Sequence, residues 1–238
     1  MIRFSFKQAA TAGSLGMAAL LASCATKAPP PPPPPPITVV IPPKPVPPRG
    51  AADNFTVPAI GADGVRQTVN AHLSAAQTTW NLRSALNVAA LNCVRAEDAD
   101  ILAGYKSLLK EHGKSLTTAN KALDQEFRQK YGSAYIAPRE RYMTQVYNYF
   151  ALPPTRERFC TAARAVAREA ATVKKGELEA FAARSLPQLE SVYEAFFQDY
   201  EKYRHDLAAW QAQYGARTAS PSVSFNAPLS GSSATPRR

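Results

Sequence analysis

The 238-residue sequence has little of what most enzymes and metal proteins need. Its three histidines, His72, His112 and His205, stand far apart and form no HExxH or other metal-ligand spacing. No GxSxG, P-loop or GxGxxG motif occurs, and the acidic neighbours Glu177 and Glu179 would lie on different faces of a helix. We therefore predict no catalytic residue, no cofactor and no bound metal, so the chain is not expected to be an enzyme.

The sequence also has no apolar run long enough to cross a bilayer near its start. A charged beginning with Arg3 and Lys7 precedes a short apolar stretch over residues 9–21. A permanent transmembrane helix needs about 20 apolar residues, so this stretch is too short. The layout is typical of the n-region and h-region of a secretory signal peptide.

The tetrapeptide at the end of this stretch is more specific. Leu21-Ala22-Ser23-Cys24 resembles the lipobox of bacterial lipoproteins. The resemblance implies a signal peptide over residues 1–23 and a Cys24 that carries diacylglycerol and palmitate as the first residue of the mature chain. An ordinary secretory signal that happens to contain a cysteine is the alternative. Ala25, where an Asp would signal retention in the inner membrane, resembles the outer-membrane sorting pattern.

The segment that follows Cys24 is rich in proline. Of 21 prolines, eight form the unbroken run at residues 29–36 and more follow at residues 42–48. Proline removes backbone donors and favours polyproline II, so residues 24–62 are predicted to be a linker. Residues 29–48 would extend on the order of 60 Å. The segment is either a simple spacer or a strut that sets the distance of the domain from the membrane.

The apolar residues of segment 63–214 are spaced as in helices, and the segment shows no convincing period-two alternation of the kind that strands have. We therefore predict an all-α domain. Short connections favour an antiparallel bundle of about five helices, and residues 215–238 read as a disordered Ser/Pro-rich tail. The expected helices span residues 63–92, from about 95 to Gly132, from Pro138 to before Pro153, from an N-cap at Thr155, and from a capping box at Ser185 to Gly215.

Two of these helices carry notable patterns. The stripe of the second includes Leu108, His112 and Leu116, which makes His112 an expected core residue, and we predict one long helix despite Gly113. The third presents a wide aromatic arc that includes Tyr142 and Tyr149. We interpret this arc as core, with an exposed aromatic ligand surface as the alternative.

The cysteine count agrees with export. Three cysteines are present, and assigning Cys24 to the lipid leaves Cys93 and Cys160. An even pair in an exported domain predicts a disulfide, with two unconnected buried thiols as the alternative.

The chain is basic, with a formal net charge of +10. An exported, anchored domain does not normally meet nucleic acid, so we predict no nucleic-acid partner. The region from Arg156 to Lys175 is basic and the region from Glu190 to Asp206 is acidic, and pairing of solvated faces accounts for both. Contact of the basic region with lipid headgroups or anionic wall polymers is the alternative.

Together these features predict a protein anchored in the outer membrane and facing the periplasm, or in the cell membrane of a single-membrane organism. Its helical domain would bind peptidoglycan or an envelope protein, in an oligomeric state that the sequence leaves open. A cell-wall-polymer-acting enzyme and an accessory subunit of an export or efflux assembly remain as alternatives.

Overall fold

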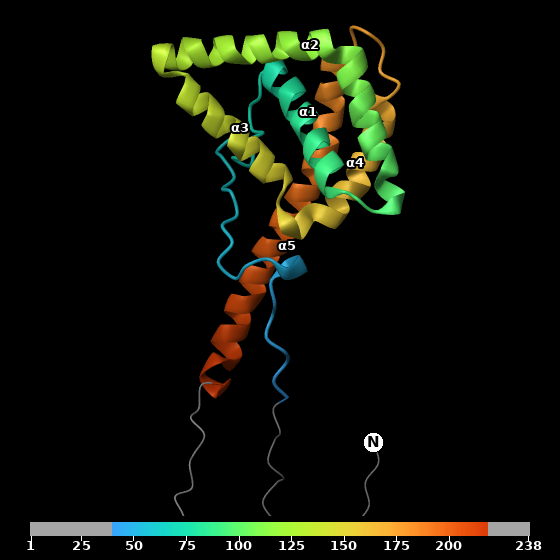
Figure 1. Cartoon of the computed structure of the whole chain (residues 1–238). Coiled ribbons are helices and arrows are strands. Elements are labelled where there is room, and N and C mark those ends of the chain that lie inside the picture. The colour runs from blue at the N-terminus through green and yellow to red at the C-terminus, as the bar shows by residue number, and fades with distance from the viewer. Residues whose placement is uncertain (1–39, 219–238) are drawn as a thin grey trace, which may run out of the picture. The chain divides into compact units, whose positions relative to one another are not determined.

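The computed structural model describes residues 40–218 of the chain. Within this range the only β-type pairing is an isolated bridge between Ile60 and Arg66. Five α-helices carry the fold, which confirms the all-α, bundle-like class (Figure 1). They are α1 (Ala75–Asn92), α2 (Ala99–Tyr131), α3 (Ile136–Phe150), α4 (Arg156–Ala170) and α5 (Leu178–Thr218).

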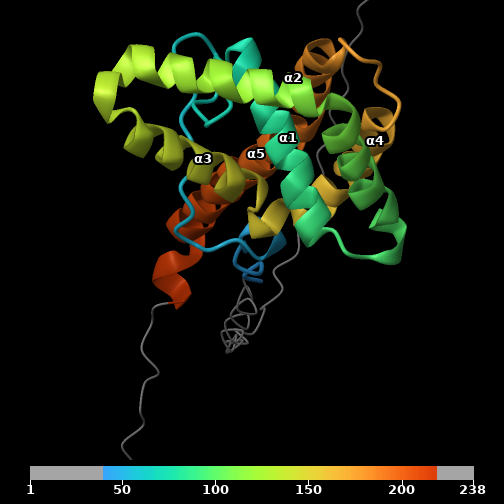
Figure 2. The ribbon, with the colours of Figure 1, turned by 45° about the horizontal axis from the view of Figure 1, so that its top comes forward.

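The core forms around α1, which contacts each of the other four helices (Figure 2). Its buried face is rich in small and aliphatic side chains, such as Leu82, Ala85 and Leu86, so its neighbours can approach closely. Helices α2 and α4 approach each other closely at Gly104. A Cβ atom added to Gly104 would lie 2.1 Å from the carbonyl oxygen of Ala167, so only glycine fits there.

Helix α2 bends at His112, where the backbone departs from helical geometry with φ −114° and ψ 17°. His112 is buried, and its Nε2 lies 3.2 Å from the carbonyl oxygen of Val173, as expected for a hydrogen-bonded core histidine. The expectation of one long helix through Gly113 is thus correct in extent but omitted the bend. The two halves of α2 serve different neighbours, since one lies beside α4 and the other beside α3 (Figure 1).

Helix α1 begins 12 residues later than the predicted start at Asp63. Ser74 is its N-cap, and Ser74 and Gln77 form a reciprocal capping box. Asp63 accepts instead from the backbone N–H of Val65 at 3.0 Å, which is a local turn that competes with helix formation. Residues 63–74 therefore form turns, and the prediction of a helix over them was wrong.

Helix α5 begins before the predicted cap at Ser185 and encloses Pro187. Upstream of Pro187 the side chains of Phe181, Ala182 and Leu186 are buried in the core. Burial of that apolar surface offsets the roughly 3 kcal/mol that an interior proline costs a helix. The helix also continues past the predicted end at Gly215 to Thr218.

Two further predicted boundaries can be compared. Pro138 lies in the first turn of α3, as expected. Thr155 occupies the N-cap position of α4, but its hydroxyl donates to the carbonyl of Leu152 at 2.8 Å and makes no capping bond.

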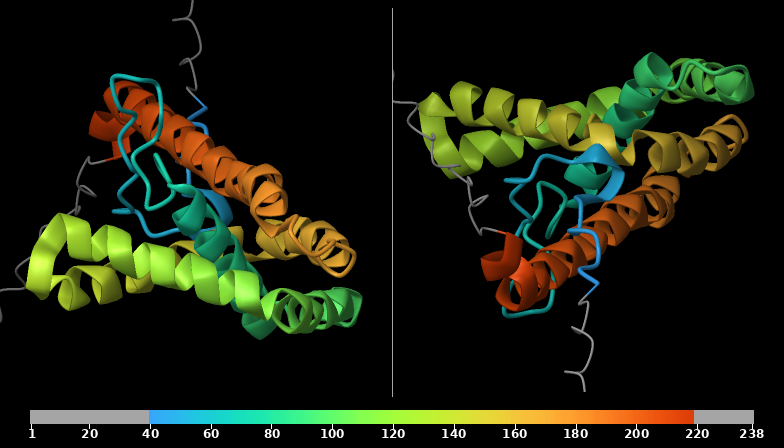
Figure 3. Two further views of the ribbon diagram at one scale, coloured as in Figure 1. Left: turned by 90° about the horizontal axis from the view of Figure 1, so that it is seen from above. Right: turned by 90° about the horizontal axis from the view of Figure 1, so that it is seen from below.

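The folded part reaches further upstream than residue 63. Ala51 belongs to the buried core, and Phe55 packs against it. Residues 51–74 lie between α5 and the pair formed by α2 and α3 (Figure 3). Part of the segment that the sequence assigns to the linker is therefore part of the domain. The proline run at residues 29–36 and most of the predicted tail lie outside the described residues.

Candidate functional site

Cys93 and Cys160 form the predicted disulfide, with their Cα atoms 5.5 Å apart. Cys93 follows the last residue of α1, and Cys160 lies in the second turn of α4. The bond joins segments 67 residues apart in sequence, so it fixes the turn between α1 and α2 against α4. Cys24, the predicted lipidation site, lies outside the described residues.

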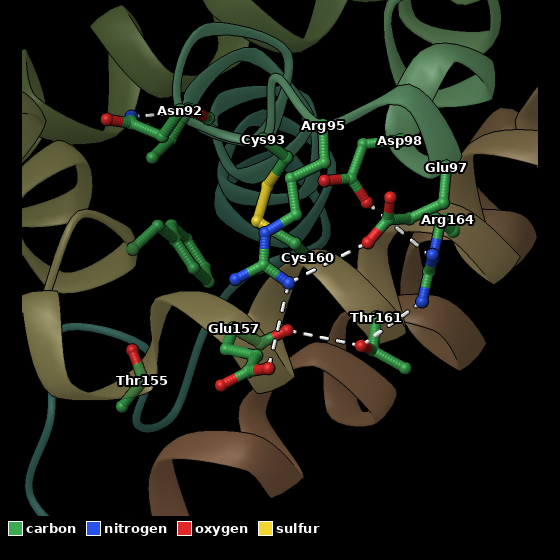
Figure 4. Close-up of a disulfide and its surroundings, with 12 residues drawn as sticks. Asn92, Cys93, Arg95, Glu97, Asp98, Thr155, Glu157, Cys160, Thr161 and Arg164 are labelled. Atoms are coloured by element: carbon green, nitrogen blue, oxygen red, sulfur yellow. Dashed lines mark hydrogen bonds and ion pairs between the residues drawn. A yellow bond between two sulfur atoms is a disulfide. The ribbon is translucent and has the colours of Figure 1, made fainter. Parts of the chain in front are cut away.

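Several ion pairs surround the disulfide (Figure 4). Arg95 Nη1 lies 3.6 Å from Glu157 Oε1 and 3.7 Å from Glu97 Oε1. The Asp98 carboxylate, which is 3% exposed, lies 3.7 Å from Nε of Arg164. These pairs link the start of α2 to α4 beside the covalent bond.

A hollow of about 740 Å³ opens next to the disulfide. Arginines from three separate segments line it, namely the turn before residue 51, the turn between α1 and α2, and the start of α4. These arginines are Arg49, Arg95, Arg156 and Arg158. Asp98 and Glu157 are the acidic residues of the lining. The hollow can thus accept an anion.

A second, smaller hollow of about 220 Å³ lies between α5, α3 and the segment before α1. Glu190 lines it, and burial raises the pKa of this carboxyl to about 7, although the Asn70 amide beside it opposes the shift. Glu194, one turn further along α5, lines the same hollow. Its pKa is lowered because Arg66 donates to it, with Nε 2.7 Å from Oε2 and Nη2 3.1 Å from Oε1.

A buried polar relay leads into this hollow from α3. The Tyr142 hydroxyl donates to Asn81 Oδ1 at 2.9 Å, and Asn81 Nδ2 donates to Asn70 Oδ1 at 2.8 Å. Asn70 is 8% exposed, and its amide lies beside the Glu190 carboxyl, where it opposes the rise of the carboxyl pKa. The hollow therefore places a buried amide next to a carboxyl whose pKa burial raises.

Carboxyl groups whose pKa values are driven apart are the usual acid and base of a hydrolytic site. Glu190 is suited to donate a proton near pH 7. The carboxylate of Glu194 is already hydrogen bonded by Arg66, whose guanidinium also contacts Glu201 and the carbonyl of Pro58. This arrangement supplies an acid but leaves the second carboxylate engaged.

A third hollow, of about 400 Å³, lies between the second half of α2 and the start of α3. Its aromatic lining consists of Phe127, Tyr131 and Tyr142, and Phe127 contacts both tyrosine rings at centroid distances of 5.8 and 5.5 Å. At the nearby helix ends Tyr131 is 41% exposed and Ile136 60% exposed. Part of the predicted aromatic arc of α3 thus reaches a surface groove, while Val146 and Phe150 are buried.

The proline-rich segment before the domain is attached to α5. Trp210 Nε1 donates to the carbonyl of Pro42 at 2.8 Å, and Arg49 Nη2 donates to Asp199 at 2.5 Å. The Tyr200 hydroxyl lies 2.8 Å from the carbonyl oxygen of Ala52. From Pro42 to Arg49 the contacts move from Trp210 back to Asp199, so this part of the segment runs antiparallel to the helix.

The structure does not bring the remaining candidate residues together. His112 lies in the core, and His72 and His205 are exposed. No group of three potential metal ligands occurs among residues 40–218. Glu177 and Glu179 lie at the start of α5, outside the Glu190 hollow.

Sequence reasoning missed Glu190, Asn70 and the arginine-lined hollow. Asn70 and Glu190 come from segments 120 positions apart, and neither belongs to a motif. The one available signal was the spacing of Glu190 and Glu194, which places two carboxyls one above the other on a helix.

Comparison with protein-family models, curated proteins and solved structures finds no significant match for this chain. No helix within residues 40–218 has the length and apolar character needed to cross a bilayer.

Proposed function

We propose that this chain is an outer-membrane-anchored lipoprotein facing the periplasm, whose helical domain is a binding module for an envelope protein or the cell wall. The lipobox-like site at Cys24 supports the anchor, and at least two acyl chains make such attachment durable. The observation that carries the proposal is the docking of residues 42–52 along α5.

That docking couples the domain to its tether. From Pro42 to Arg49 the segment spans about 22 Å at the rise of polyproline II, and from Asp199 to Trp210 the helix spans about 16 Å. The similar lengths leave little slack, so the free part of the tether ends near residue 41. A domain held in this way keeps a fixed orientation to the end of its tether, which suits a binder that must meet a partner at a set position.

The groove between α2 and α3 is the surface on which we expect the partner. Exposed aromatic side chains next to polar ones are typical of binding surfaces. Tyr131 and Ile136 are exposed at the end of the α2–α3 pair, where a partner can reach them. The charged side chains at the groove, Glu126, Lys130 and Arg141, would select the orientation of that partner.

Crosslinking in intact cells tests this proposal. A photoreactive residue at Tyr131 or Ile136 should trap a partner. The control is a photoreactive residue at the exposed Lys174, which follows the C-terminal end of α4 and is not part of the groove, and it should trap little. Deleting residues 29–36 removes about 25 Å of reach and should abolish the crosslink, while residues 42–48 keep their contacts with α5.

A Gly/Ser replacement of residues 29–36 separates a strut from a spacer. A strut predicts loss of the crosslink in both versions, with unchanged helicity and membrane attachment. If both versions keep the full crosslink, the prolines act only as a spacer. If no partner is trapped at Tyr131, Ile136 or elsewhere on the groove, the binding role itself is refuted.

The Glu190 hollow favours a second candidate function, an enzyme that acts on a cell-wall polymer with Glu190 as general acid. The test is release of soluble fragments from purified wall material. Glu190→Gln should abolish release, whereas Glu179→Gln, an exposed carboxyl on the same helix, should not. Absence of release by the unaltered chain would exclude this reaction. An accessory role in an export or efflux assembly would instead give a transporter component in the crosslinks described above.

A further inference from the structure

We propose that the hollow beside the Cys93–Cys160 disulfide binds a phosphate group. This inference does not depend on the proposed function, because it concerns a different surface from the α2–α3 groove. Two arginine side chains at the hollow have no acidic partner. Among the described residues the side chains of Arg95, Arg164 and Arg168 all pair with acids, whereas those of Arg156 and Arg158 make neither an ion pair nor a hydrogen bond and line the hollow.

Arg49 adds a donor from another segment. Its Nη2 is used by Asp199, but its Nη1 is buried and has no acceptor. A buried donor without a partner is costly, and an anion in the hollow would satisfy it. Arg49 is held in place by Asp199 and by the ring of Phe196, whose centroid lies 5.9 Å from the guanidinium carbon.

The start of α4 contributes positive potential at the same place. The first N–H groups of a helix lack intrahelical partners. No side chain caps them at the start of α4, since the Thr155 hydroxyl bonds to the carbonyl of Leu152, and the N–H of Arg156 is bonded to the carbonyl of Pro153. The positive end of the 15-residue helix therefore adds to the charge of Arg156 and Arg158.

The acidic residues of the lining do not cancel this charge. Asp98 is buried against Arg164, and Glu157 faces Arg95. Each of these carboxylates already has an arginine, so the guanidinium groups of Arg156 and Arg158 and the Nη1 of Arg49 remain for a ligand.

The hollow is also rigid. The disulfide holds the turn that carries Arg95 against α4, and Pro153 and Pro154 fix the backbone that leads into the helix. Such a frame limits the entropy that is lost when the arginines close on a ligand.

These features fit phosphate better than a carboxylate. Three guanidinium groups from two segments exceed what one carboxylate can use, but they match the several oxygens and higher charge of a phosphate monoester or pyrophosphate. A volume of about 740 Å³ leaves room for the organic part of a phosphorylated molecule. A soluble phosphate compound and a phospholipid headgroup share this chemistry.

Calorimetric titration with pyrophosphate at constant ionic strength tests the site. The protein is the chain from residue 24 onward with Cys24→Ser, which has no lipid of its own. Unaltered arginines should give saturable binding, and Arg156→Gln with Arg158→Gln should weaken it at least about tenfold. The matched control is Lys174→Gln with Lys175→Gln, which removes the same charge beyond the other end of α4 and should change the affinity by less than about twofold.

A conservative variant guards against a folding defect. Arg156→Lys with Arg158→Lys keeps the charge but loses the paired donors, so its affinity should fall between those of the unaltered chain and the Gln variant. Circular dichroism should show the same helicity in all four proteins.

Vesicles then identify the source of the phosphate. If phosphatidylglycerol vesicles bind the unaltered chain but not the Gln variant, the ligand is a lipid headgroup. If only pyrophosphate shows this dependence, the ligand is a soluble phosphate compound. Absence of saturable binding to either probe, or equal loss in the arginine and lysine variants, would overturn the proposal.

Discussion

The indole N–H of Trp210 donates to the carbonyl of Pro42 at 2.8 Å, across 168 positions of sequence. Tyr214, one helical turn further on, packs against the Trp210 ring with centroids 6.0 Å apart. A polyproline II segment presents carbonyls that no backbone donor satisfies, and aromatic side chains with a polar N–H suit such a ligand. In this protein the proline-rich segment before the domain is bound by the protein's own last helix.

The contact of the proline-rich segment with α5 should be visible through Trp210 fluorescence. In a Trp80→Phe background Trp210 is the single tryptophan, because the chain has two. Replacing residues 42–48 with Gly and Ser should expose the indole and shift its emission to longer wavelength. The same replacement at residues 29–36 serves as control and should leave the spectrum unchanged; an equal shift in both would contradict the docking.

The disulfide should contribute strongly to stability. Closing a loop between positions 67 apart removes unfolded-state entropy worth about 4 kcal/mol. Chemical denaturation of Cys93→Ser with Cys160→Ser should therefore show a free energy of unfolding lower by about 2–4 kcal/mol. Adding reductant to the unaltered protein should produce a comparable loss and should have no effect on the double variant.

Glu190 should make the protein less stable as the pH rises. Below its ordinary pKa of 4.5 the carboxyl is protonated in both states, whereas between 4.5 and about 7 only the folded state retains the proton. The folded state binds more protons in this window, so the free energy of unfolding falls as pH increases through it. Glu190→Gln should remove this dependence and stabilise the protein at pH 8 by on the order of 2 kcal/mol.

Denaturation curves at pH 5 and pH 8 provide the measurement for Glu190. Glu179→Gln changes an exposed carboxyl of the same helix and should retain the slope of the unaltered protein. An unchanged slope in Glu190→Gln would show that the carboxyl is not buried in the way described.

Two glycines of α2 should respond in opposite directions to alanine. At Gly104 the new Cβ would collide with the backbone of Ala167, so Gly104→Ala should force α2 and α4 apart and cost about 2–4 kcal/mol. At Gly113 nothing lies within 4 Å of the added atom, so Gly113→Ala should stabilise the helix by up to about 1 kcal/mol. Thermal unfolding of the two variants tests this, and a similar response of both would refute the close contact.

The all-α class, the pairing of Cys93 with Cys160 and the core position of His112 could all be predicted from the sequence. Each depends on local spacing or on simple counting, which needs no knowledge of how segments meet. Helix boundaries were harder to predict from the sequence. Asp63 and Ser185 have side chains that can cap a helix, but neither lies at the start of one. At Ser185 the burial of Phe181 outweighs both the cap and Pro187, and its hydroxyl is left without a partner.

The tertiary structure alone decided the sites. Arg49, Arg156 and Arg158 converge because the chain returns to the same place after about 100 residues, and Glu190 meets Asn70 for the same reason. Hydrophobic burial drives that convergence. Because its free energy depends on apolar area, it does not select which polar side chains come to lie beside one another. Local patterns in the sequence set where the helices lie and which residues are apolar. The packing of the helices then set which arginine side chains lack an acidic partner and which carboxyl is buried.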